Sequence, residues 1–239
     1  MNSSAALIRN LVAAADRGEL QYVALFSNSI NTKKVVEATA QALKDVSRPT
    51  SSQIIESSHG EAALRDVTTK ILMGVVWSTA ASLEKSARFP ELASMDCTCT
   101  TNKEGRPFLR VTGLDGDGKI FTRANGLLWD QSEDAFNFVL QTALPRLWGK
   151  SVCDATSLIM TDGDPQEITA VKVAMMSHFE NATRKRCLWH LVHQEFLKMF
   201  GTGELDEDTN KIIWAGSIAL HSTSRHLLNY YSRLRLMHC

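Results

Sequence analysis

The segment SLIMTDGDP at residues 157–165 decides the fold class of this chain. Its apolar run predicts a short buried strand, and that strand delivers Asp162 into a Gly/Pro turn. Open α/β sheets keep their functional sites outside the carboxyl ends of their strands. We therefore expect Asp162 to lie where chemistry would take place.

A second acidic residue, Asp96, has the same setting upstream. Residues 89–96 read as a strand that starts beside Pro90 and ends on Asp96, before a small polar run at 97–102. Two acids at strand ends predict a site for Mg²⁺ or Mn²⁺, which prefer oxygen ligands and keep waters for substrate phosphates. The alternative is that each Asp caps a turn or a helix N-terminus.

Composition indicates a globular protein with a real core. The chain has 239 residues, of which 44% are hydrophobic. No apolar run approaches the roughly 20 residues of a membrane span, and residues 1–4 do not start a secretory signal. Five cysteines at irregular spacing do not indicate a disulfide framework, so we expect an intracellular, reducing location and no membrane partner.

The charge distribution is uneven although the formal net charge is zero. Zero net charge gives no overall electrostatic footprint for nucleic acid. Residues 91–182 carry 8 basic and 13 acidic groups, a balance of −5, and they include both candidate metal ligands. This excess fits a carboxylate cluster that awaits cations, and it fits a solvated acidic surface equally well.

The pattern from residue 91 to 200 predicts the element order β-β-β-α-β-α-β-α. After the strand that ends on Asp96, the predicted elements are strands at 107–114 and 120–129 joined by the hairpin turn DGDG, a helix at 133–148, a strand at 156–161, a helix at 165–179, a strand at 183–190 and a helix at 191–200. Upstream, we expect a helix at 4–16, a short strand at 22–26 and a Ser-rich linker within 44–60. The order resembles an α/β fold with a ribonuclease-H-like core, a mixed five-stranded sheet flanked by helices.

Four motifs in this order resemble the Mutator-like element (MULE) transposase domain. They are residues 89–102, GRPFL at 105–109, TDGD at 161–164 and CLWH at 187–190. The plant far-red-response regulators, derived from such transposases, share these motifs. The resemblance covers roughly residues 75–195 and is fairly specific because it needs all four motifs together.

The resemblance implies a DDE-type nuclease and strand transferase, in which Asp96 and Asp162 are the first two catalytic acids and hold Mg²⁺ or Mn²⁺. It implies transposon ends and target DNA as partners and a nuclear location, and it is compatible with a homo-oligomer. In the family the catalytic Glu follows a helical insertion after the CxxH motif, whereas this chain stops at Cys239 inside that region. Glu195, 33 residues after Asp162, is the alternative third acid, and we expect a missing Glu instead.

The basic and CxxH residues near the last predicted strand leave several readings open. Cys187 and His190 supply two of the four ligands of a structural Zn²⁺, and packing, DNA contact and catalysis are the alternatives. Arg184, Lys185 and Arg186 either contact phosphate or form a solvated strand edge.

These observations divide the chain at residues 74 and 200. We expect an N-terminal helical or mixed region at 1–74, the ribonuclease-H-like MULE core at 75–200 and a truncated start of the helical insertion at 201–239. The expected function is that of a DNA transposase catalytic domain, without robust cleavage by the chain as given. The alternative is a non-catalytic DNA- or protein-binding regulatory module or an inactive remnant, and the fold alone does not decide between them.

Overall fold

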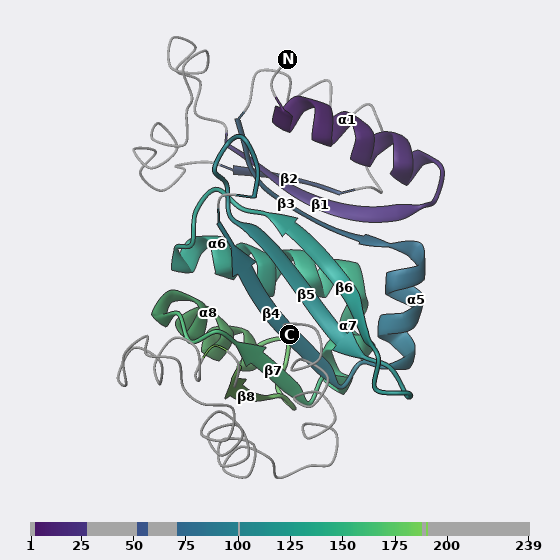
Figure 1. Ribbon diagram of the computed structural model, residues 1–239, viewed down its shortest axis with the longest axis vertical. Coiled ribbons are helices and arrows are strands. Elements are labelled where there is room, and N and C mark those ends of the chain that lie inside the picture. Colours follow the sequence, from purple (N-terminus) through teal and green to yellow (C-terminus); the bar gives the residue numbers. More distant parts are fainter. Residues whose placement is uncertain (1–2, 28–51, 57–70, 100, 188–189, 191–239) are drawn as a thin grey trace, which may run out of the picture.

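All the strands that the structure describes belong to one mixed sheet. The computed structural model describes residues 3–27, 52–56, 71–99, 101–187 and 190. The strand order across the sheet is β2-β1-β3-β6-β5-β4-β7-β8 (Figure 1). The strands are β1 (Leu20–Ser27), β2 (Ser52–Glu56), β3 (Ile71–Thr79), β4 (Leu92–Thr98), β5 (Phe108–Leu114), β6 (Ile120–Leu127), β7 (Leu158–Thr161) and β8 (Thr183–Arg186).

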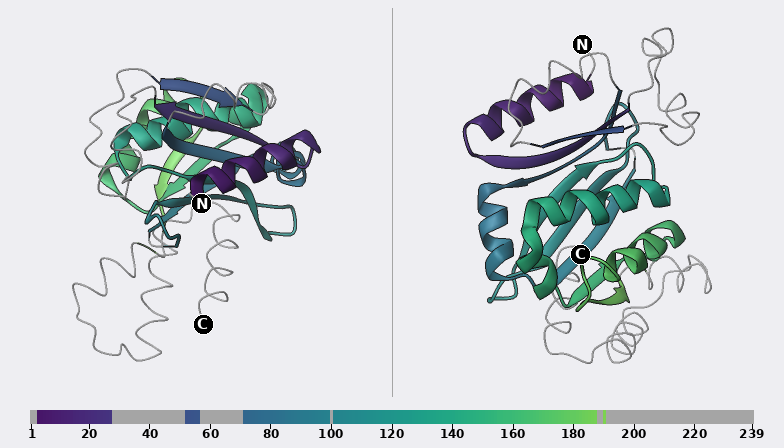
Figure 2. Two further views of the ribbon diagram at one scale, coloured as in Figure 1. Left: turned by 90° about the horizontal axis from the view of Figure 1, so that it is seen from above. Right: turned by 180° about the vertical axis from the view of Figure 1, so that it is seen from behind.

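Helices cover both faces of this sheet. The helical elements are α1 (Ser3–Asp16), α5 (Ala80–Arg88), α6 (Glu133–Asn137), the π-helix η2 (Phe138–Ala143), α7 (Leu144–Ala155) and α8 (Pro165–Met175). The α6-η2-α7 segment and α8 lie on one side, and α1 lies against β1 near the other end of the sheet (Figure 2). Within the described residues, no helix is long and apolar enough to cross a bilayer.

Strand β1 is buried on both faces, which explains its nearly continuous apolar sequence. Val23 and Leu25 belong to the large core under the α6-η2-α7 layer. The alternate residues Tyr22, Ala24 and Phe26 belong to a second core with helix α1. A strand covered on both faces needs no polar alternation, so its sequence reads as one apolar run.

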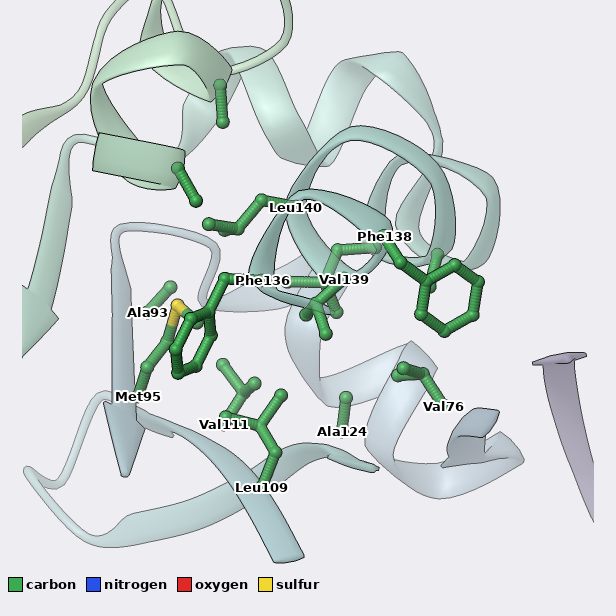
Figure 3. Close-up of a cluster of buried hydrophobic side chains, with 14 of the residues drawn as sticks. Val76, Ala93, Met95, Leu109, Val111, Ala124, Phe136, Phe138, Val139 and Leu140 are labelled. Carbon is green, nitrogen blue, oxygen red and sulfur yellow. The ribbon is translucent and has the colours of Figure 1, made fainter. Parts of the chain in front are cut away.

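The large core fills the space between the sheet and the α6-η2-α7 layer. Phe136 of α6 lies over Met95 of β4 and Val111 of β5, and Leu140 extends the same surface (Figure 3). All four side chains are at most 1% exposed. Close packing of this kind fixes the position of β4 relative to the helices, since an interior as dense as a crystal leaves little freedom to shift.

The order of elements expected after residue 91 is confirmed as far as β8, and the predicted size of the sheet is wrong. Strands β4, β5 and β6 form an antiparallel meander, and β7 and β8 add parallel to β4. Three further strands join because β3 pairs with the free edge of β6 through Val75 and Leu127. The expected linker at 44–60 contains one of them, β2, which pairs antiparallel with β1.

The division of the chain at residues 74 and 200 stays a prediction. Strand β3 runs across the first of these positions, and the second lies outside the described residues, as does the helix expected at 191–200.

The helix expected at 133–148 is interrupted by a π-helical turn. Ser132 caps α6 as the sequence indicates, since its hydroxyl accepts a hydrogen bond from the Ala135 N–H at 3.3 Å. Farther on, the Leu144 N–H donates to the Val139 carbonyl, five residues back. Pro145, the second residue of α7, has no N–H for the regular helical bond, which favours a change of hydrogen-bond register just before it.

Arg123 of β6 is completely buried and holds the start of β4 in place. Its Nη1 donates to the carbonyls of Pro90 and Leu92 at 3.1 and 2.8 Å, and its guanidinium lies 3.9 Å from the centre of the Trp148 ring. Burial lowers its pKa to about 10, so it remains charged near neutral pH. Carbonyl dipoles, the Ser86 hydroxyl at 3.3 Å and a ring face stabilise the charge, although Nη2 has no hydrogen-bond partner among the described residues.

We predict that Arg123→Met destabilises the protein by about 2–4 kcal/mol, because the change leaves buried carbonyls without donors. Urea denaturation followed by circular dichroism measures the loss. The exposed neighbour Arg110 on β5 provides the control, and Arg110→Met should change stability by less than about 0.5 kcal/mol. A loss below about 1 kcal/mol for Arg123→Met would contradict the anchoring role.

Candidate functional site

Asp96 lies near the carboxyl end of β4, on the face turned away from the core. The neighbouring residues Met95 and Cys97 point into the core, so alternation along the strand directs Asp96 to the other side. Its side chain is 53% exposed. The Thr98 hydroxyl donates to it at 3.5 Å, and the Nε2 atom of His190 lies 3.5 Å from its Oδ1.

Asp162 is the first residue after β7, at the same edge of the sheet as Asp96. The last register pair of the parallel strands β4 and β7 is Ser94 with Met160, and each aspartate follows two residues farther along the chain. The structure therefore places both candidate ligands at neighbouring strand ends. Their joint role in binding a metal stays a prediction.

The loop after β7 holds Asp162 in a defined orientation. Its Oδ1 accepts a hydrogen bond from the Asp164 N–H at 2.8 Å, which forms a local Asx turn. Between them Gly163 has a φ of 106°, a left-handed conformation that favours glycine. The Arg186 Nε donates to the Asp162 carbonyl at 3.1 Å and closes the loop from β8.

Asp164 caps helix α8. Its Oδ1 accepts hydrogen bonds from the N–H groups of Gln166 and Glu167 at 2.8 and 3.1 Å. Asp164 thus fulfils the ordinary role of an N-cap aspartate.

Glu167, in the first turn of α8, is a candidate site residue that the sequence reasoning missed. It is 1% exposed, and neither carboxyl oxygen has a partner with hydrogen-bond geometry. Burial first, and then the charge and carboxyl group of Asp162, raise its pKa well above the usual range. If Glu167 carries a proton, its carboxyl group can donate a hydrogen bond to the Asp162 carboxylate. This explains why Glu167 interacts with Asp162 although no donor reaches its own oxygens.

The sequence did contain a signal for Glu167. It lies three, four and seven residues before Ala170, Val171 and Ala174, which form the buried face of α8. A glutamate in phase with a buried helix face is unusual and is a marker of function or of a partner. The pattern was hidden because Asp164 and Glu167 also have the spacing of a capping box, which explains such a glutamate without any function.

The Cys97 thiol on β4 is influenced by the charges of both Asp96 and Glu167. This thiol is mostly buried, and burial first, with the nearby negative charges of Glu167 and Asp96 adding to it, raises its pKa to about 12. Both carboxylates are therefore within electrostatic reach of one β4 side chain. A thiol with so high a pKa stays protonated at neutral pH and is a poor nucleophile or metal ligand.

Cys187 and His190 of the CxxH motif contact different parts of the sheet edge, and the basic residues of β8 lie beside them. Cys187 is buried and its N–H donates to the Thr161 carbonyl at 2.6 Å, whereas His190 faces Asp96. The Nη1 of Arg184 donates to the Thr161 hydroxyl at 3.3 Å. Zinc binding by Cys187 and His190, and phosphate contacts by Arg184, Lys185 and Arg186, stay predictions.

The described part of the chain contains no group of three or more His, Cys, Asp or Glu side chains already arranged as metal ligands. Glu195 falls outside that part, so its assignment as a third acid stays a prediction. The donors at the sheet edge are nevertheless carboxylate oxygens, the ligand type that Mg²⁺ prefers. The unpartnered oxygens of Glu167 fit such a cation, so the residues present are chemically suited to a hard divalent ion.

Comparison with known proteins identifies the segment that contains this edge. Residues 92–194 match the MULE transposase domain. The matched MULE segment begins with β4 and includes β7 and β8, so it contains Asp96, Asp162 and Glu167.

A similar protein is the PKS-NRPS hybrid synthetase cheA of Chaetomium globosum. It is 24% identical to this chain over 158 residues, which are 64% of this chain and 3% of the synthetase. The chain thus spans a very small part of that relative, and the synthetase activity in the name is that of the relative.

We predict that Glu167→Gln stabilises the metal-free protein at neutral pH by roughly 1–3 kcal/mol, because it removes a buried ionisable group. The folded-state pKa of Glu167 is raised, so the folded state holds a proton that the unfolded state has already released. The stability contribution of Glu167 is present in acid and is lost as pH rises through the folded pKa. Urea titrations of both proteins in a chelator should diverge as pH increases, and parallel curves would contradict the assignment.

We predict that Gly163→Ala destabilises the loop after β7. An added Cβ would overlap the Arg186 guanidinium, and the positive φ is unfavourable for alanine. Hydrogen exchange of the Asp164 N–H should accelerate in the variant. Gly18→Ala tests φ alone, because Gly18 also has a positive φ but open space around it.

Proposed function

We propose that this chain provides the DNA-binding, metal-dependent core of a Mutator-type transposase, with Asp96 and Asp162 as its first two acids. The parallel register of β4 and β7 carries the proposal, because it brings two acids far apart in sequence to one edge of the sheet. The match of residues 92–194 to the MULE transposase domain supports it independently.

The five strands from β4 to β8 support a ribonuclease-H-like core. In spatial order they are β6-β5-β4-β7-β8, an antiparallel meander extended by two parallel strands. In that arrangement the central strand β4 and its parallel neighbour β7 present their carboxyl ends together. This edge is where a phosphodiester could meet both acids.

A divalent cation held there would stabilise charge on phosphate oxygens and activate water. The residues of the chain itself hold the two acids in position. The Asx turn to Asp164 orients Asp162, the Arg186 bond to the Asp162 carbonyl closes the loop, and His190 lies beside Asp96. His190 is placed to orient the more exposed of the two acids.

DNA is the partner that this chemistry requires, as transposon ends and as target. Arg184, Lys185 and Arg186 on β8 lie next to the strand that leads to Asp162. Their positive charges are suited to the phosphate backbone near the acids. A nuclear location and a homo-oligomeric assembly belong to the same proposal.

A non-catalytic module is the second candidate function. It is favoured by the lack of a preformed three-ligand cluster among the described residues. The far-red-response regulators are the model for this reading, in which the fold and the DNA contact persist for regulation. The two functions share the metal and DNA surface and differ in strand cleavage.

We predict that the chain binds Mn²⁺ weakly and that Asp162→Asn nearly eliminates the binding, because the change removes one of few carboxylate ligands. Isothermal titration calorimetry measures the affinity. Asp117→Asn, in the exposed hairpin turn between β5 and β6, is the matched control and should leave it unchanged. Equal binding by Asp162→Asn and the parent chain would remove Asp162 from the site.

Strand cleavage tests which of the two functions applies. With Asp96 and Asp162 as the acids, we expect Mn²⁺-dependent DNA binding without robust nicking, because in-line displacement needs both the attacking and the leaving oxygen stabilised. Incubation with a nicked-end duplex, resolved by denaturing electrophoresis, gives the answer. Robust cleavage that Glu195→Gln abolishes would contradict this expectation and show that Glu195 completes the acid triad.

A further inference from the structure

Glu167 is a buried carboxyl group that the proposed function does not use. Burial of an ionisable group is costly unless a partner compensates for it. Among the described residues Glu167 forms no ion pair, and neither of its oxygens has a hydrogen-bond partner. A carboxyl group in this state needs an explanation, and either a proton shared with Asp162 or a cation that is not part of the chain would provide one.

A structural role as a helix cap does not explain why the Glu167 carboxyl group is buried. In a capping box the glutamate at the third helical position bonds back to the N–H of the N-cap residue. Here the N-cap is Asp164, and its N–H donates instead to Asp162 Oδ1 at 2.8 Å. The backbone donor that would have satisfied Glu167 is thus already used by the site.

The Glu167 carboxyl lies close enough to Asp162 for the two side chains to interact. The Asp162 charge and its carboxyl group are, after burial, the strongest influences on Glu167, ahead of Asp164. Asp162 is half-buried and follows β7, so the two carboxyl groups meet at the carboxyl end of that strand. Two carboxylates this close repel each other unless a proton or a cation lies between them.

We propose that Glu167 and Asp162 together hold one divalent cation at the carboxyl end of β7, with Glu167 as a direct ligand. This inference rests on the proposed function and adds a ligand to its metal site. Two carboxylates completed by water and substrate phosphate are the usual coordination of Mg²⁺ in phosphoryl-transfer sites. Asp96, one strand away at the same edge, remains available to the cation.

The test uses the full chain with Mn²⁺ as the probe and calorimetry as the readout. We compare the parent with Glu167→Gln and Asp162→Asn, and with Glu84→Gln as a control at an exposed glutamate on α5. Glu167→Gln should weaken Mn²⁺ binding by about tenfold or more, and Glu84→Gln should not change it. Glu167→Leu, which also removes the carboxylate, serves as a second variant, and circular dichroism verifies that each variant is folded.

Terbium luminescence distinguishes a direct ligand from a residue that only positions Asp162. Lifetimes in H₂O and D₂O count the water molecules on the bound ion. Loss of a coordinating carboxylate in Glu167→Gln should add about one water, whereas loss of a positioning contact should leave the count unchanged.

The outcomes separate this inference from the proposed function. If Asp162→Asn loses Mn²⁺ binding while Glu167→Gln keeps the parent affinity and water count, Glu167 shares only a proton with Asp162 and the inference is overturned alone. If the parent chain binds no Mn²⁺, the proposed metal-dependent function and the inference are overturned together. Weakened binding in both variants, with the added water in Glu167→Gln, supports both.

Discussion

The parallel pairing of β4 with β7 is the constraint on which the candidate site depends. The two strands are separated in the chain by a hairpin and by the α6-η2-α7 helices, yet Ala93 aligns with Ile159 and Ser94 with Met160. A slip of one residue would turn each side chain of β7 to the opposite face. The core residues Met95 and Ile159 oppose such a slip, because a wrong register would turn Ile159 away from the core that it shares with Met95.

Two buried arginines are held mainly by backbone carbonyls of the sheet. Arg123 binds the carbonyls at the start of β4, and Arg106 donates to the carbonyls of Leu72, Met73 and Leu128 around β3 and β6. Burial lowers the pKa of Arg106 to about 10, with the charge of Glu104 acting in the opposite direction. Backbone carbonyls are thus the main partners of both cations, and the Glu104 carboxylate, 3.9 Å from Arg106 Nη1, is an additional partner of Arg106.

The sequence predicted the elements that have a strong local pattern. The DGDG turn between β5 and β6 is one example: Asp115 Oδ1 accepts the N–H groups of Asp117 and Lys119, as its short polar side chain favours. Strand β2 could not be predicted because Ile54 and Ile55 are a short apolar pair in a Ser-rich segment, and their pairing with β1 is a long-range contact. The count of five strands failed for the same reason, since local patterns do not show which free sheet edge will be extended.

The site was predictable in part. Asp96 and Asp162 follow apolar runs, so the carboxyl ends of their strands could be expected to lie together. Glu167 could not be assigned from its motif, because the capping-box spacing offered a complete local explanation. Only the direction of the Asp164 N–H toward Asp162 shows that this local explanation fails.

The three acids of the sheet edge differ in how much water they keep, and this difference bears on how a cation would be held. Asp96 is 53% exposed, Asp162 is half-buried and Glu167 is 1% exposed. A cation gains least from an exposed carboxylate, because water already solvates both partners. A buried carboxylate that lacks donors gains more from a cation, because nothing else satisfies its oxygens, but the raised pKa of Glu167 means that the cation must also displace a proton. Cation binding through Glu167, as proposed, would therefore strengthen as pH rises, whereas the exposed Asp96 would contribute a weaker and more hydrated contact.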